Sequence, residues 1–161
     1  MREKKKTTKG IQNRLGIFPE WFLWLGTAFL AIGVLATYLY FYGGKPDFFE
    51  TKIFAVYTSY IKTRYFVWAQ TNLLDEIGGV FSLIGLFFMG FARVKTETAQ
   101  INAMRIKSLL QAVVITVFAW ILVFAFVYGW PIFIASTFVF YLFLLLNFVI
   151  FRVKYLLYKN H

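Results

Sequence analysis

The chain has 161 residues, of which 60% are hydrophobic and 22% aromatic, and it carries a net charge of +10 at pH 7. Because soluble domains are about 45–50% apolar, this surplus predicts that lipid surrounds much of the chain. There is no cysteine and the one histidine is His161, which excludes thiolate nucleophiles, thiolate metal sites and histidine-ligated haem. We therefore expect no cofactor and no bound metal.

The first residues differ sharply from those that follow. Residues 1–15 are polar and basic, and we expect them to form a flexible cytoplasmic tail. We expect residues 16–161 to form one transmembrane domain of four helices. The first predicted span, residues 21–42, has no charged side chain and exceeds the roughly 20 residues that a helix needs to cross a bilayer. Two glycines and Pro46 then end it.

Aromatic residues crowd the segment that follows, residues 50–70. Ile53, Val56 and Tyr57 begin a series of apolar side chains at three- and four-residue spacing, and polar side chains such as Lys52 fall between them. This spacing predicts an amphipathic helix. Because Tyr and Trp favour the boundary between membrane and water, we expect the helix to lie along the membrane surface or to cap the helix bundle. It would serve there as a structural element or as a platform for a ligand or partner.

The second predicted span, residues 74–92, is rich in small side chains. Gly78, Gly79, Ser82 and Gly85 lie on or beside one face of this helix. Small residues let the backbone of a neighbouring membrane helix approach closely. These four residues are therefore a candidate helix-packing face.

A polar segment, residues 93–108, follows the second span. Its composition predicts a cytoplasmic helical linker in which Arg93 and Glu97 pair at i,i+4 spacing. We expect this helix to continue without a break into the third span, residues 109–128.

Gly129 and Pro131 indicate a tight turn, after which residues 131–151 form the fourth predicted span. Thirteen of the 17 lysines and arginines fall in the N-terminal tail, in the polar linker and after the fourth span. The other four fall between the first two spans. Because cytoplasmic loops carry an excess of basic residues, this distribution predicts that both termini are cytoplasmic and that residues 50–70 lie outside.

Two adjacent carboxylates, Asp75 and Glu76, are the first candidate polar site. They sit at the expected outer mouth of the second span, where they could bind a cation or a substrate. Acidic residues at a helix start also cap the backbone and favour the helix dipole, and this alternative explains them without a ligand.

Asn147, deep in the fourth span, is the other candidate polar residue. It could hydrogen-bond to a neighbouring helix or line a permeation path, and helix-to-helix bonding is the favoured interpretation. The first, third and fourth predicted spans contain no Asp, Glu, Lys, Arg or His. Ion-coupled transporters place a carboxylate near the midplane of the membrane, so this composition argues against that class.

Several short patterns resemble a family of small four-span bacterial inner-membrane proteins to which no activity is assigned. The patterns are TNxxDEIxG from Thr71 to Gly79, IxxxRxxSL from Ile101 to Leu109, FVYGxP from Phe126 to Pro131, and RxxxxLYK from Arg152 to Lys159. The resemblance covers about residues 71–159. It implies a four-span architecture in a bacterial inner membrane and adds no mechanism.

The sequence thus predicts an all-α membrane protein with four transmembrane helices and one extracytoplasmic amphipathic helix. We expect a non-enzymatic role as an accessory subunit or regulator of a larger inner-membrane assembly. The alternative is a small homo-oligomeric ion channel or transporter. The expected partners are the lipid bilayer and other membrane-protein subunits or further copies of this chain, with no nucleic acid.

Overall fold

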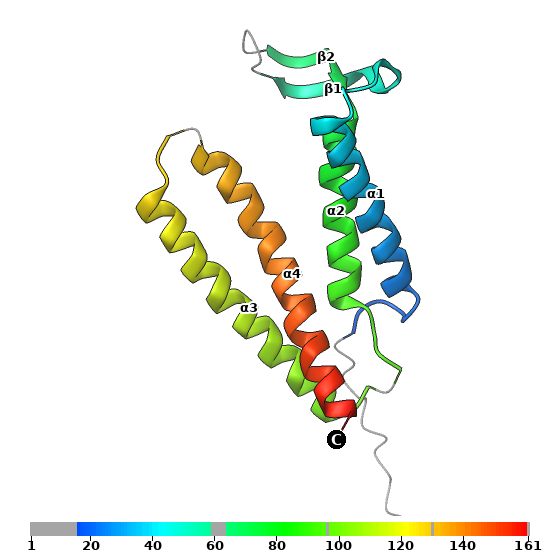
Figure 1. Cartoon of the computed structure of the whole chain (residues 1–161), viewed down its shortest axis with the longest axis vertical. Helices are drawn as coiled ribbons and strands as arrows, with labels where there is room; N and C mark the ends of the chain where they lie inside the picture. The colour runs from blue at the N-terminus through cyan, green and yellow to red at the C-terminus, as the bar shows by residue number, and fades with distance from the viewer. Residues whose placement is uncertain (1–15, 59–63, 96, 130, 161) are drawn as a thin grey trace, which may run out of the picture. The chain divides into compact units, whose positions relative to one another are not determined.

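The computed structural model describes residues 16–58, 64–95, 97–129 and 131–160. The expected tail, residues 1–15, lies outside these ranges. The described chain is mostly helical, and four of its helices are long and apolar enough to cross a membrane (Figure 1). The elements are α1 (Phe22–Tyr42), the 3-10 turn η1 (Asp47–Phe49), β1 (Glu50–Thr58), β2 (Arg64–Asn72), α2 (Leu74–Phe91), α3 (Ala99–Phe126) and α4 (Pro131–Lys159).

These elements divide into two compact units, and each is described by itself. The first unit, Trp21–Gly90, contains α1, η1, the two strands and most of α2. The second unit joins the described residues up to Glu20 to the chain from Phe91 onward, and contains α3 and α4.

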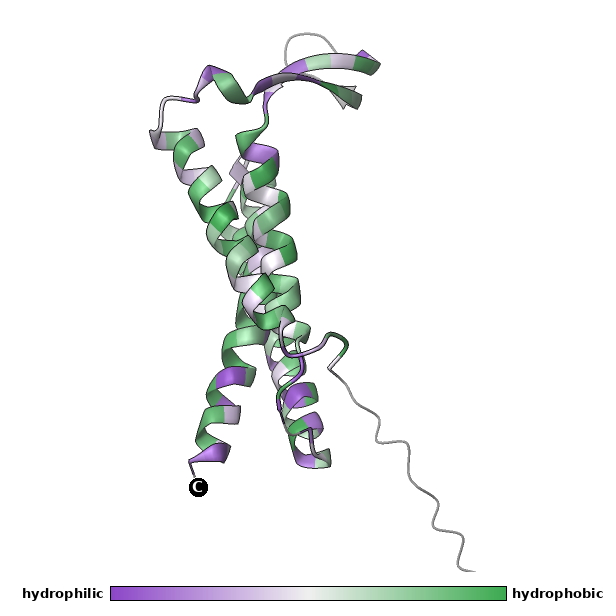
Figure 2. Cartoon of the chain, turned by 90° about the vertical axis from the view of Figure 1, so that its right-hand side faces the viewer, coloured by the Kyte–Doolittle hydropathy of each residue, from purple (hydrophilic) through white to green (hydrophobic). Residues whose placement is uncertain are grey.

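The helix lengths follow from the apolar stretches of the sequence. The 21 residues of α1 and the 18 residues of α2 agree with the predicted spans to within one residue at each end. At about 1.5 Å per residue they extend roughly 31 and 27 Å, close to the hydrocarbon thickness of about 30 Å. The 28 residues of α3 and the 29 residues of α4 exceed that thickness. Figure 2 shows mainly hydrophobic ribbon along the helices and hydrophilic residues in the last turns of α4.

Within the first unit, α1 and α2 pack backbone against backbone. A Cβ atom on Gly85 would lie 2.6 Å from the backbone nitrogen of Leu30, and one on Gly26 would lie 2.8 Å from the carbonyl oxygen of Gly85. A Cβ atom on Gly33 would lie 2.6 Å from the backbone nitrogen of Ser82. Glycine is therefore required where the two helices cross, because any larger side chain would push them apart.

The predicted amphipathic helix over residues 50–70 is wrong. These residues form an antiparallel hairpin, in which Glu50 pairs with Asn72, Phe54 with Trp68, and Thr58 with Arg64. The segment contains so many apolar residues that some of them fall at helical spacing by chance. Its β-branched and aromatic residues favour strands, and pairing between distant residues decides the outcome.

The hairpin is tied closely to the helices of its unit. A single residue, Leu73, separates the end of β2 from the start of α2, and its backbone N–H donates to the carbonyl of Phe49 at 3.0 Å. Figures 1 and 2 show the strands running across the ends of α1 and α2 rather than along the helix axes. The fold class is therefore a helical membrane protein that also contains a small two-stranded sheet.

In the second unit, α3 and α4 form an antiparallel pair. Gly129 has a φ of +75°, a conformation that glycine adopts without strain, and Pro131 occupies the first position of α4. The buried residues recur at intervals of three to five positions along each helix and so define one contact face. On α3 they are Ile101, Arg105, Ser108, Ala112 and Thr116, and on α4 they are Val139, Leu144, Asn147 and Phe151.

The expected helical linker over residues 93–108 is wrong in its first part. The described residues between 93 and 98 are not helical, and α3 begins at Ala99. The Thr98 side chain accepts a hydrogen bond from the backbone N–H of Ile101 at 3.3 Å, so Thr98 is the N-cap of α3. From Ala99 the helix runs without a break through the predicted third span, as expected.

Candidate functional site

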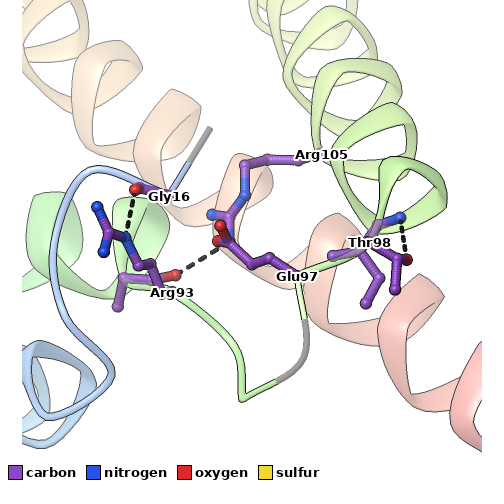
Figure 3. Close-up of polar contacts among 7 residues, drawn as sticks. Gly16, Arg93, Glu97, Thr98 and Arg105 are labelled. Atoms are coloured by element: carbon purple, nitrogen blue, oxygen red, sulfur yellow. Dashed lines mark hydrogen bonds and ion pairs between the residues drawn. The ribbon is translucent and has the colours of Figure 1, made fainter. Parts of the chain in front are cut away.

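A polar cluster at the start of α3 joins four separate parts of the second unit. The residues before Glu20 pair with the segment after α2, where the backbone N–H of Ile17 donates to the carbonyl of Phe91 at 3.1 Å. The backbone N–H of Arg93 donates in return to the carbonyl of Phe18 at 2.9 Å. The Arg93 side chain adds a further bond, from its Nε to the carbonyl of Gly16 at 2.7 Å (Figure 3).

Arg105 is the centre of this cluster and is only 6% exposed. Its Nη2 donates to the carbonyl of Ala92 at 3.1 Å and lies 3.6 Å from Oε1 of Glu97. Its guanidinium carbon lies 4.2 Å from the centre of the Phe151 ring, which places α4 on the other side of the cation. Arg105 thus links the segment after α2, the start of α3 and the last turns of α4.

Glu97 pairs with Arg105 and not with Arg93. The sequence placed Arg93 and Glu97 one helical turn apart, but the chain is not helical there, so the predicted i,i+4 pair does not form. The Glu97 side chain is 6% exposed, and neither of its carboxylate oxygens accepts a hydrogen bond from any described residue. Glu97 is therefore a buried acid whose charge is balanced but whose hydrogen-bonding capacity is unused.

Beside this cluster lies a cavity of about 530 Å³. Its charged and polar lining residues are Glu20, Arg93, Lys95, Glu97 and Thr98. We call it the α3 cavity. The set combines two carboxylates, two cations and a hydroxyl, so it suits a ligand that itself carries both charges.

The predicted candidates Asp75 and Glu76 lie in the first turn of α2. The Asp75 carboxylate accepts a hydrogen bond from the backbone N–H of Glu76 at 3.1 Å, and the Glu76 side chain is exposed. Asn72 performs the capping, because its Oδ1 accepts from the backbone N–H of Leu74 at 3.1 Å. Its Nδ2 also donates to the carbonyl of Pro46 at 3.4 Å. This geometry is that of a helix start.

The other predicted candidate, Asn147, is 2% exposed and lies on the face of α4 that packs against α3. Ser108 and Ala112, both 0% exposed, are the most deeply buried positions on α3. Asn147 therefore lies in a helix interface, a position that suits contact between helices better than a path for solutes. It belongs to a different unit from Asp75 and Glu76, so the structure does not bring the predicted polar candidates together.

The predicted packing face on α2 lies toward α1. A Cβ atom on Gly78 would meet the Thr37 hydroxyl, while Ser82 lies against Gly33 and Gly85 against Gly26 and Leu30. Gly79 is half-buried beside them.

The hairpin presents an aromatic surface in the segment that the sequence offered as a platform, but on one face of a sheet and not on a helix. We define the hairpin aromatic surface as Phe54, Val56, Phe66 and Trp68. The Phe54 and Trp68 rings are register partners with centres 5.7 Å apart, and Phe66 and Trp68 are 70% and 71% exposed. Phe66 has a φ of +50°, a strained conformation for a bulky residue. Large aromatic side chains are thus exposed on one face of a two-stranded hairpin.

Comparison with known proteins found no family model, no curated protein and no solved structure that matches this chain. The resemblance to four-span bacterial proteins therefore stays a prediction.

Proposed function

We propose that this protein is a non-enzymatic accessory subunit or regulator of a larger assembly in a bacterial inner membrane. The hairpin aromatic surface is the observation that carries the proposal. Through it the chain would bind the extramembrane part of a neighbouring membrane protein.

The chemistry of this surface favours a protein partner. Aromatic residues are enriched in the centres of protein interfaces and dominate their binding energy. Burying a side chain such as Phe66 from water contributes about 1.5–3 kcal/mol. Phe66 is 70% exposed in the described chain, so most of this contribution is left for a partner to supply. The four residues of the hairpin aromatic surface would therefore supply a substantial part of the affinity for a partner that covered them.

The hairpin also has backbone groups to offer. Within the described residues the sheet has two strands, so each strand has one unpaired edge. An isolated two-stranded hairpin is marginally stable, and an added strand would pair an open edge. A partner would thus stabilise the hairpin while binding to it.

The position of the aromatic residues indicates where that partner lies. On the same hairpin face, the polar residues Glu50 and Gln70 are closest to α2 and hydrogen-bond to each other at 3.3 Å. Trp68 is farther along β2, about 20 Å from the start of α2 at roughly 3.3 Å per residue. Because the strands run across the helix ends, the hairpin that carries these residues extends to one side of the α1–α2 pair (Figure 1). A subunit beside α1 and α2 would lie beneath it.

The orientation of the chain supports the same arrangement. The excess of basic residues in the tail, the linker and the segment after the last span favours cytoplasmic termini. The hairpin then lies on the opposite side of the membrane, with the extramembrane domains of other subunits. The absence of cysteine and of any histidine besides His161 gives no reason to assign a reaction.

The test is affinity purification of the full chain from its native membrane in a mild detergent, with mass spectrometry of what accompanies it. The variant Phe54→Ala/Trp68→Ala removes the centre of the aromatic surface. The matched control Phe118→Ala/Phe138→Ala removes two equally exposed phenylalanines from α3 and α4. We expect wild type and control to recover a larger partner in fixed stoichiometry, and the hairpin variant to lose it by at least about tenfold.

Three results would contradict the proposal. Recovery of the wild-type chain alone as a monomer would leave no partner. Recovery of the chain alone as a defined homo-oligomer would favour the channel alternative. Retention of the partner by the hairpin variant would move the interface elsewhere.

A further inference from the structure

The α3 cavity has a lining of mixed charge. Arg93 and Lys95 supply two cations, and Glu20 and Glu97 supply two carboxylates. Its volume of about 530 Å³ lies within the range of small-molecule sites. A ligand with a single charge would meet two repelling groups as well as two attracting ones, so the lining favours a zwitterion.

Glu97 identifies the cationic half of such a ligand. Its carboxylate is nine-tenths buried and lines the cavity, and none of the described residues donates a hydrogen bond to it. Arg105 balances the charge from 3.6 Å, which is beyond hydrogen-bonding distance. Buried carboxylates are otherwise hydrogen-bonded, so Glu97 favours a ligand with N–H donors. A primary ammonium group offers three.

The other half of the cavity suits a phosphate. Arg93 and Lys95 both line it, and guanidinium groups bind phosphate oxygens well. The N-terminus of the 28-residue helix α3 begins beside Thr98 and adds the positive end of its dipole. Cations and a helix start on one side, with a buried carboxylate on the other, match an ammonium group joined to a phosphate.

The depth of the cavity indicates the source of the ligand. Its lining residue Glu20 lies two residues before α1, and Arg93 lies two residues after α2. Both helices are long and apolar enough to cross a membrane, so the cavity lies next to the ends of two spans, at the level where lipid headgroups lie. We propose that the α3 cavity binds the phosphoethanolamine headgroup of a membrane phospholipid. The ammonium group donates to Glu97, and the phosphodiester binds Arg93 and Lys95. This inference is independent of the partner that the hairpin binds.

The same chemistry predicts which headgroups are rejected. A choline headgroup carries a quaternary ammonium that has no N–H donor, so it leaves Glu97 without a hydrogen bond. A glycerol headgroup offers hydroxyl donors but carries no cation, so it lacks the charge attraction to Glu20 and Glu97 that an ammonium group gains. The ethanolamine headgroup satisfies both halves of the cavity.

Native mass spectrometry of the full chain in detergent micelles tests this proposal. The chain is titrated with phosphatidylethanolamine, phosphatidylcholine and phosphatidylglycerol that carry the same acyl chains. We expect the wild-type chain to bind phosphatidylethanolamine about tenfold more tightly than the other two, the value of a hydrogen bond to a charged group. Glu97→Gln should abolish the preference. Lys107→Gln, an exposed position on α3 outside the cavity, is the matched control and should keep it.

Because Glu97→Gln removes the partner of Arg105 and could unfold the chain, Glu20→Gln is a second variant at an exposed position of the lining. It should weaken the preference about threefold. Equal affinity for the three lipids, or a preference unchanged in both variants, would overturn the proposal. The phosphoethanolamine group could belong to a membrane phospholipid or to a free soluble compound, and competition by free glycerophosphoethanolamine distinguishes the two. Weak displacement of phosphatidylethanolamine by the free compound supports the lipid, whereas tight binding of the free compound would overturn the lipid assignment.

Discussion

Arg105 shows how one buried cation can organise a membrane protein at the end of its helices. Its neighbours Ala92, Glu97 and Phe151 come from three parts of the chain. A buried ion pair adds little net stability, because removing two charges from water offsets their attraction. The pair is more important for specificity. Through Glu97 and the Ala92 carbonyl, Arg105 holds the segment between α2 and α3 against the helix pair.

The first prediction concerns this pair. Arg105→Met keeps most of the apolar side-chain length but leaves the Glu97 carboxylate buried without its cation. We expect the free energy of unfolding to fall by about 3 kcal/mol. Adding Glu97→Gln should recover more than half of this loss, because the uncompensated charge is gone. Unfolding of the single and double variants in mixed micelles, followed by circular dichroism, measures both values. A double variant no more stable than Arg105→Met would show that charge pairing is not the cause.

At the residue scale, the sequence did not predict which charged side chains pair with one another. It placed Arg93 and Glu97 together, because it assumed a helix through that segment. The actual partner of Glu97 is Arg105, eight positions away, across the N-cap Thr98. Thr98 is a residue type that commonly starts helices, but the prediction did not use it as a start signal because it assumed a helix from residue 93. The cation–π contact with Phe151 was not readable from the sequence, because it depends on how α4 packs against α3.

At the scale of elements, the α1–α2 pair is held by close backbone contact. Large aromatic rings flank the crossing points, and Phe29 meets Phe81 and Phe88 edge-on or tilted at 5.2 and 6.1 Å between ring centres. In lipid, helix association depends on packing, because the hydrophobic effect does not distinguish lipid from protein. The glycines are therefore expected to set the stability of the pair.

The second prediction concerns Gly26 and Ala28, two positions on α1. Gly26→Val should destabilise the pair by about 1–3 kcal/mol, the usual cost of overpacking, because its Cβ would lie 2.8 Å from the Gly85 carbonyl oxygen. Ala28→Val adds similar bulk at an exposed position and should change little. Thermal unfolding of both variants in the same detergent gives the comparison. Equal melting temperatures for the two variants would refute close packing at Gly26.

Helices and strands differed in how well the sequence predicted them. Long uncharged stretches give α1, α2, α3 and α4 directly, because only a helix satisfies its own backbone over such a length. The hairpin was missed for the opposite reason. Its stability comes from pairs such as Phe54 with Trp68, which are far apart in the sequence and invisible to any local spacing.

At the scale of the whole molecule, the chain combines four membrane-length helices with two features that lie at helix ends, the hairpin and the Arg105 cluster. The hairpin belongs to the unit of α1 and α2, and the Arg105 cluster belongs to the unit of α3 and α4. The topology that we propose from the positive-inside rule would place them on opposite sides of the membrane. A partner at the hairpin and a lipid headgroup in the α3 cavity would then meet the protein from different sides. Both proposals depend on this topology.

Cysteine accessibility tests that topology most directly, because the natural chain has no cysteine to mask. Single variants Lys52→Cys on β1, Lys107→Cys on α3 and Lys159→Cys at the end of α4 place a thiol at exposed positions. They are treated with a membrane-impermeant maleimide before and after the membrane is opened. We predict labelling of Lys52→Cys in intact spheroplasts, and labelling of Lys107→Cys and Lys159→Cys only after opening. Labelling of Lys107→Cys in intact spheroplasts, or protection of Lys52→Cys there, would contradict the account.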